Sequence, residues 1–203
     1  MTVQQMQQSS ACTALYTPSA DRLDTGHGLV PVICFHLPTE PNGFLSNWYP
    51  AGFDLDGQHF TSTEQYIMYR KAELMNDPAT AQKILQTDDP QKQQDLGQSV
   101  TPFIPKLWDG ICQLIALRAL TAKFTQNPAL RQALLATGDA WLVECAHKDK
   151  IWACGCRLTE PERLNIQQWP GKNILGFALM EVRNKELDKF ITQPKNKRTV
   201  QIE

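Results

Sequence analysis

The sequence has no long hydrophobic run. None of its apolar stretches approaches the roughly 20 residues that a membrane-spanning helix needs, and its first residues lack the charged and apolar regions of a secretory signal peptide. Net charge is also nearly absent, at −1 for 203 residues, so no overall field favours nucleic acid or an anionic membrane. We therefore expect an intracellular, cytoplasmic protein with no membrane partner.

Cysteine is scarce and scattered, which argues against a disulfide framework. The six positions are Cys12, Cys34, Cys112, Cys145, Cys154 and Cys156. Without a secretory signal, reduced thiols are expected. Cys145, His147, Cys154 and Cys156 offer donor types that zinc uses, but their C-x-H and C-x-C spacings are tighter than those of a usual zinc knuckle. Small buried cysteines in a strand–turn–strand hairpin explain them better, so we expect no metal and no other cofactor.

Helices dominate the predicted secondary structure, and there are no internal repeats. Strands are predicted at 29–36, at 53–60 as a hairpin turning at Asp56-Gly57, and at 141–145 paired with 151–154. Helices are predicted from Ser62, after Asp77-Pro78, after Asp89-Pro90, over 106–124, from Asn127-Pro128 to Gly138, and over 174–190. The fold class is therefore α+β: a helix-rich single domain over 29–190, with a flexible extension at 1–28 and a basic tail at 191–203.

The helix that begins at Ser62 carries the most informative pair of residues. Seven positions separate Glu64 from Lys71, almost two full turns, so both side chains leave the same side of the helix as Ile67 and Met68. A carboxylate and an amine on a face that points inward are costly to bury. The alternative is ordinary: Glu64 could complete a capping box with Thr61, and Lys71 could extend across an apolar surface.

A set of short motifs resembles the NADAR family over about residues 34–188. In chain order they are Gly43-Phe44-Leu45-Ser46-Asn47, Ser62-x-Glu64, Lys71, Lys106-Leu107-Trp108-Asp109, Leu120-Thr121-Ala122-Lys123-Phe124, Asn127-Pro128, Ala136-Thr137-Gly138-Asp139, Leu142-Val143-Glu144, Asp149-x-x-Trp152, Gly171-Lys172-Asn173-x-Leu175-Gly176 and Leu179-Met180-Glu181-Val182-Arg183. The resemblance implies a NADAR-like N-glycosidase. Such an enzyme hydrolyses the C1′–N bond between a ribose and a nucleobase-like amine.

The resemblance also implies roles for particular residues. Lys71 matches the lysine that attacks C1′ in the family, which requires it to lose its proton near neutral pH. Glu64 is placed on the same helix face to shuttle protons. Asp149 could hold a ribose hydroxyl or assist proton transfer, although a turn aspartate is the plainer reading of its local sequence. The expected substrate-binding residues are Phe44, Ser46, Asn47, Trp108, Trp152, Asn173 and Gly176, with two core tryptophans as the alternative for Trp108 and Trp152.

Two classes of substrate fit this chemistry. One is a phosphoribosylamino-pyrimidine of riboflavin biosynthesis; the other is ADP-ribose attached to guanine, free or in nucleic acid. The loop 157–170 is longer than in compact pyrimidine-cleaving members, and Ala153 stands where glycine is common. Stacking of an adenine on Trp169 of that loop would favour the ADP-ribosyl substrate. A non-catalytic ADP-ribose-binding module remains the alternative, but such a module has no need of a buried amine.

Overall fold

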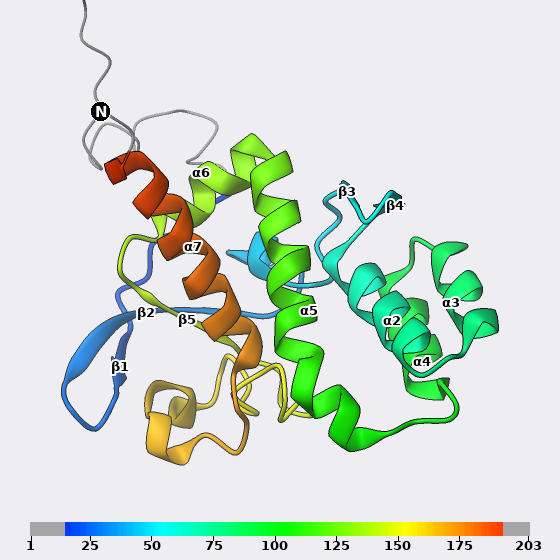
Figure 1. Cartoon of the computed structure of the whole chain (residues 1–203). Helices are drawn as coiled ribbons and strands as arrows, with labels where there is room; N and C mark the ends of the chain where they lie inside the picture. Colours follow the sequence, from blue (N-terminus) through cyan, green and yellow to red (C-terminus); the bar gives the residue numbers. More distant parts are fainter. Residues whose placement is uncertain (1–14, 193–203) are drawn as a thin grey trace, which may run out of the picture.

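A computed structural model describes residues 15–192, and it places one long helix, α5, at the centre of the molecule (Figure 1). The elements in chain order are β1 (Arg22–Asp24), β2 (Leu29–Phe35), η1 (Gly43–Leu45), β3 (Phe53–Leu55), β4 (Gln58–Phe60), α2 (Thr63–Leu74), α3 (Pro78–Leu85), α4 (Pro90–Ser99), α5 (Pro105–Gln126), α6 (Pro128–Ala136), β5 (Trp141–Glu144), η2 (Pro161–Leu164), η3 (Ile166–Gln168) and α7 (Ile174–Thr192). The predicted α+β class is confirmed. Within 15–192, no helix has both the length and the apolarity to cross a membrane.

Short sequence patterns predicted most of the helix starts correctly. Asp77 and Asp89 accept hydrogen bonds from backbone N–H groups in the first turns of α3 and α4, and a proline follows each. The predicted hairpin forms between β3 and β4, where Asp56 and Gly57 both have positive φ, as a type I′ turn requires.

The three-stranded sheet has the order β1-β2-β5, and it corrects one prediction. β5 pairs with β2 in parallel, with Phe35 opposite Glu144, and residues 151–154 form no strand. The reason is that the backbone of 150–153 accepts hydrogen bonds from the N–H groups of 172–175, which lead into α7. Both parallel strands therefore end at one edge of the sheet, where ligands commonly bind in α/β arrangements.

Part of the predicted flexible extension, residues 1–28, is ordered in the structure. Residues 1–14 lie outside the described residues, but residues 22–24 form β1, antiparallel to β2. Leu23 is fully buried against Val32 and Val143. A single apolar side chain among polar neighbours gives no periodicity, so the sequence alone did not indicate this strand. The basic residues 195–198 of the predicted tail also lie outside the described residues.

Two packed clusters share α5 as their common wall. In Figure 1, α7 lies along one side of α5 and α2 to α4 lie on the other. Leu120 and Phe124 of α5 belong to the cluster formed with α6, α7 and the sheet. Trp108 and Ile115 belong to the cluster formed with α2, α3 and the hairpin. Trp152 packs against both clusters, which places it at their junction.

Candidate active site

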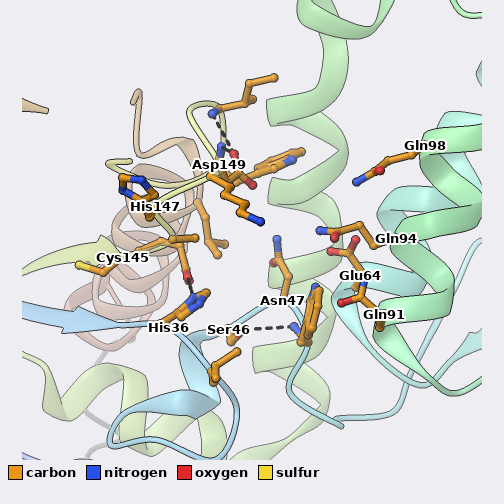
Figure 2. Close-up of a pocket in the computed structure, with 18 of the residues that line it drawn as sticks. His36, Ser46, Asn47, Glu64, Gln91, Gln94, Gln98, Cys145, His147 and Asp149 are labelled. Carbon is orange, nitrogen blue, oxygen red and sulfur yellow. Dashed lines mark hydrogen bonds and ion pairs between the residues drawn. The ribbon is translucent and has the colours of Figure 1, made fainter. Parts of the chain in front are cut away.

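A cavity of about 1020 Å³ opens where the two clusters meet (Figure 2). Its walls come from the segment after β2, the loop 46–48, helices α2 and α4, the start of α5, residues 144–152 and residues 157–159. The cavity size is at the upper end of the range usual for small-molecule sites, roughly 300–1000 Å³. Segments distant in the sequence therefore converge on one space large enough for a nucleotide-sized ligand.

Lys71 reaches this cavity from α2. Its Nζ donates a hydrogen bond to the Gly97 carbonyl oxygen at 2.7 Å, and lies 4.6 Å from the Phe103 ring centroid and 5.7 Å from that of Trp108. Burial lowers the pKa of Lys71, and the negative charge of Glu64 opposes the shift. A lysine held in this way keeps two of its three donor positions free for chemistry.

The absence of a side chain at Gly97 allows Lys71 to reach its hydrogen-bond acceptor. A side chain at position 97 would collide with the Met68 side chain, so glycine lets the backbone of α4 approach α2 closely. The Gly97 carbonyl belongs to the last turn of α4, where carbonyls lack intrahelical donors. Lys71 satisfies that carbonyl, and α4 in turn fixes the direction of the amine.

Glu64 is 5% exposed and does not act as the capping residue. Ser62 caps α2 by accepting from the Gln65 N–H, and Gln65 Oε1 accepts from the Thr61 N–H. The capping-box alternative for Glu64 is therefore wrong. Among the described residues, Glu64 Oε1 has no hydrogen-bond partner.

The environment of Glu64 favours its protonated form. Its pKa is raised to about 8, mainly by burial and then by the charge of Asp149. The charge of Lys71 and a hydrogen bond from the Trp48 side chain oppose the shift. A carboxyl group that keeps its proton at neutral pH is suited to donate that proton to a substrate.

Asp149 is a turn aspartate that also lies at the cavity. Its Oδ1 accepts from the N–H groups of Ile151 and Trp152, each at 2.8 Å, as a turn aspartate does. It also lines the cavity, and its charge acts on Glu64 (Figure 2). The turn thus holds a carboxylate in place on the cavity wall.

Four of the seven expected substrate-binding residues line the cavity. They are Ser46, Asn47, Trp108 and Trp152. The loop that carries Ser46 and Asn47 is tied to α2, because the Asn47 carbonyl accepts from the Glu64 N–H at 3.0 Å. Trp108 is 5% exposed, so it belongs to the core and to the cavity wall at once.

The other three, Phe44, Asn173 and Gly176, do not line the cavity. Phe44 is 1% exposed and packs edge-on against Phe124. The Asn173 side chain joins the Glu144 N–H to the Leu142 carbonyl, which fastens α7 to β5. At Gly176 any side chain would collide with the Leu142 carbonyl. Packing explains why these three residues occupy their positions, and their place in a sequence motif could not show this.

Trp169 does not face the cavity either. Its Nε1 donates to the Arg163 carbonyl, and its ring packs with the cluster around Leu23 and Val143. Only the first residues of its loop, 157–159, reach the cavity. Ala153 is fully buried and does not line the cavity. The position of Trp169 therefore gives no support for adenine stacking on its ring.

The predicted cysteine–histidine group has members in two places. Cys145 and Cys154 have their sulfur atoms 3.9 Å apart in the buried cluster. Cys145 and His147 both line the cavity, and His147 Nδ1 lies 3.7 Å from Glu160 Oε2 (Figure 2). Over residues 15–192 no three His, Cys, Asp or Glu side chains are arranged to hold a metal ion.

Two features of the cavity were missed in the sequence. Gln91, Gln94 and Gln98 of α4 line it, at a spacing of three and four residues that places them on one helix face (Figure 2). His36 lies on the opposite side (Figure 2), and its Nδ1 is 2.8 Å from Glu144 Oε1. The glutamine spacing was a usable signal. The His36–Glu144 pair gave none, because 108 positions separate the two residues.

A fully buried lysine supports the loop that carries Ser46 and Asn47. Lys123 Nζ donates to the carbonyl oxygens of Phe44 at 2.8 Å and Ser46 at 2.9 Å. Burial lowers its pKa to about 7. Lys123 is not a cavity residue, so it positions the loop from behind.

Lys123→Met should change the pH dependence of stability in a defined direction. Because the folded-state pKa is about 7 and the ordinary value is 10.5, the folded wild type binds fewer protons than the unfolded chain between these pH values, and its stability rises with pH. Methionine does not titrate. Urea denaturation should therefore show that the free-energy difference between wild type and variant shifts in favour of the wild type from pH 7 to pH 9. A difference that stays constant would mean that Lys123 remains charged in the folded protein.

Comparison with known proteins finds relatives over most of the chain. Residues 34–187 match the NADAR domain. The chain is 40% identical over 146 residues to N-glycosidase R617 of Acanthamoeba polyphaga mimivirus, covering 68% of this chain and 85% of that protein. It is 30% identical over 151 residues to N-glycosidase Npun_R5314 of Nostoc punctiforme, covering 74% and 90%. It is 32% identical over 151 residues to the riboflavin biosynthesis protein VVA0006 of Vibrio vulnificus, covering 74% of this chain and 37% of that protein.

A solved structure shares the fold. The NMR structure of the Escherichia coli protein YbiA superposes with a TM-score of 0.69 at 24% identity, covering 90% of this chain and 98% of that one. The match to the domain and the identity to these relatives agree with the resemblance found in the sequence motifs. The chain therefore belongs to the NADAR domain family.

Proposed function

We propose that this protein hydrolyses the C1′–N bond between a phosphoribosyl or ADP-ribosyl group and a nucleobase-like amine, through a Schiff base on Lys71. Its class, a hydrolase of N-glycosyl bonds, follows from relatives that are N-glycosidases. The substrate and the role of each residue are our inference from the geometry of the cavity.

One observation carries the proposal. Glu64 and Lys71 leave the same helix face into the same cavity, and their pKa values are shifted toward each other. At neutral pH the carboxyl group of Glu64 retains its proton, while the amine of Lys71 gives up its proton more readily than a lysine in water. An acid and a nucleophile at one site are what cleavage of an N-glycosyl bond needs.

The first half of the reaction transfers the sugar to the lysine. Glu64 donates its proton to the ribose ring oxygen; the C1′–O bond breaks, and the lone pair of the base nitrogen forms a C=N bond to C1′. Lys71 Nζ then adds to C1′. A proton passes from Nζ to the base nitrogen through the Glu64 carboxylate, the C1′–N bond to the base breaks, and the base leaves as a neutral amine. C1′ remains joined to Lys71 as a protonated imine.

The second half releases the sugar. Water adds to C1′ and gives a proton to the Glu64 carboxylate, and Lys71 then departs as an amine, leaving an aldehyde that closes to ribose. One water is consumed, one C–N bond is replaced by a C–O bond, and nothing is oxidised or reduced. Asp149 keeps a negative charge near Glu64, which favours return of the proton to Glu64 before the next cycle.

The cavity favours the larger class of substrate. At about 1020 Å³ it exceeds what a phosphoribosylamino-pyrimidine needs, and residues 157–159 extend its wall. The Gln91–Gln94–Gln98 row presents amides, which can donate to and accept from the edge of a base. These features support ADP-ribose attached to guanine as the preferred substrate, with the free nucleotide and modified nucleic acid as its two sources.

Product release from both classes of substrate tests the proposal. Wild-type protein should liberate the free base from ADP-ribosylated guanosine faster than from a phosphoribosylamino-pyrimidine, as followed by chromatography. ADP-ribose should also inhibit more strongly than ribose 5-phosphate. Faster cleavage of the pyrimidine compound would reverse the substrate assignment. Tight binding of ADP-ribose without cleavage of either compound would instead identify a binding module.

A further inference from the structure

A second ionisable pair lies across the cavity from Lys71 and Glu64. His36 directly follows β2, and Glu144 is the last residue of β5, so parallel pairing of the two strands brings them to one edge of the sheet. His36 Nδ1 and Glu144 Oε1 are 2.8 Å apart, and both residues line the cavity. Figure 2 shows His36 on the side of the cavity that faces Glu64.

Glu144 has an unused acceptor. The residue is 6% exposed, and its Oε2 has no hydrogen-bond partner among residues 15–192. A buried oxygen without a donor is unfavourable, and more so on a charged group. Burial raises the pKa of Glu144 to about 7, and the hydrogen bond with His36 opposes the shift. The Oε2 atom of Glu144 can therefore accept a hydrogen bond from a donor group on a ligand.

The chemistry of the pair selects the kind of donor. A phosphate would be repelled by the carboxylate and offers only acceptors at neutral pH. A metal ion would need further ligands, and the described part of the chain provides no such group here. A sugar hydroxyl is neutral, donates one hydrogen bond, and accepts another, so it suits a carboxylate that is already held by a histidine.

We propose that Glu144, held in position by His36, binds the 2- and 3-hydroxyl groups of the substrate ribose. This subsite rests on the proposed function, because it orients the sugar for that reaction. The 2-hydroxyl is on the carbon next to C1′ and the 3-hydroxyl is one carbon further on, so holding both on the sheet side of the cavity leaves C1′ facing α2, which carries Lys71 and Glu64.

Calorimetric titration with sugar phosphates tests the subsite without any bond cleavage. Wild-type protein should bind ribose 5-phosphate roughly tenfold more tightly than 2-deoxyribose 5-phosphate or 3-deoxyribose 5-phosphate, as expected for a lost hydrogen bond to a charged group. Glu144→Gln should reduce this preference and Glu144→Met should abolish it. Glu181→Gln, which removes an exposed carboxylate of α7 paired with Lys185, should keep the wild-type preference.

Melting curves of the variants guard against a folding artefact, and a folded Glu144→Gln or Glu144→Met protein is sufficient for the comparison. Wild-type protein that binds the three sugar phosphates equally, or binds none, would overturn the subsite, as would an unchanged preference in a folded Glu144 variant. A hydroxyl preference without cleavage of any N-glycoside would keep the subsite and refute the proposed function. Cleavage without a hydroxyl preference would refute the subsite alone.

Discussion

Borohydride added during turnover is expected to leave the sugar covalently attached to Lys71. The reason is that a protonated imine is reduced to a stable amine, whereas an oxocarbenium ion captured by water leaves nothing on the protein. Lys71→Met should lose both the adduct and the activity, to the background rate, because Lys71 is the cavity amine that shares a helix face with Glu64. Peptide mass spectrometry of the reduced protein locates the adduct.

Lys123 is the internal control for this experiment. Its pKa is also lowered, to about 7, but Lys123 does not line the cavity and its Nζ is bonded to the carbonyl oxygens of Phe44 and Ser46. A site-specific reaction therefore labels the peptide with Lys71 and spares the one with Lys123. Equal labelling of both would indicate non-specific reaction of free aldehyde. An active Lys71→Met protein would end the Schiff-base mechanism.

Glu64→Gln is expected to make the enzyme slower and the protein more stable. Loss of a positioned acid should lower turnover by roughly 10²–10⁴. Stability should rise because the folded protein holds a carboxyl whose pKa is raised from 4.5 to about 8, mainly by burial. Glutamine has nearly the same shape and cannot ionise, so it removes this unfavourable term. Thermal melting and turnover measured on the same sample separate the two effects.

The size of the gain in stability depends on pH. Between pH 4.5 and 8 the folded wild type binds more protons than the unfolded chain, so the contribution of Glu64 to stability falls as pH rises through this window. The gain in melting temperature from Glu64→Gln should therefore be larger at pH 8 than at pH 5. The acid role also predicts that wild-type kcat/KM declines above about pH 8.

Glu73→Gln is the matched control on the same helix. Glu73 is exposed and bonded to Tyr69 and Arg70, away from the cavity, so its change should leave turnover nearly unaltered. A Glu64→Gln protein with normal turnover would remove Glu64 from the mechanism. A melting temperature lowered equally at pH 5 and pH 8 would show that Glu64 is ionised and stabilising in the folded state.

Local chemistry made much of the fold predictable. The Asp-Pro pairs at 77–78 and 89–90 combine an N-cap with a first-turn proline, and both start helices. Asp56-Gly57 tolerates positive φ, and it forms the hairpin turn. In each case the physical cause lies within about four residues of the signal. The strand predicted over 151–154 failed because the partner of that backbone is a segment 20 residues further on, which no local pattern contains.

In the candidate site too, local relations were predictable from the sequence and long-range contacts were not. Glu64 and Lys71 lie on one face of α2 because seven positions, almost two full turns, separate them in the sequence, so their shared face was predictable. The pairing of His36 with Glu144 requires β2 and β5 to run in parallel across 108 positions. Phe44 and Asn173 were assigned to substrate from motifs, and only packing distinguishes a residue that faces the cavity from one that supports it.

By itself, the sequence determined the order of the helices, the shared face of Glu64 and Lys71, and the family. Only the tertiary structure decided which carboxyl groups are buried and which oxygens lack a donor. Ser62 and Gln65 form the N-terminal cap of α2, so Glu64 is not needed there. Gly97 allows α4 to pack closely against α2 and to accept a hydrogen bond from Lys71. A pKa depends on the water and the charges around a group, and those are supplied here by segments far apart in the chain that meet only after folding.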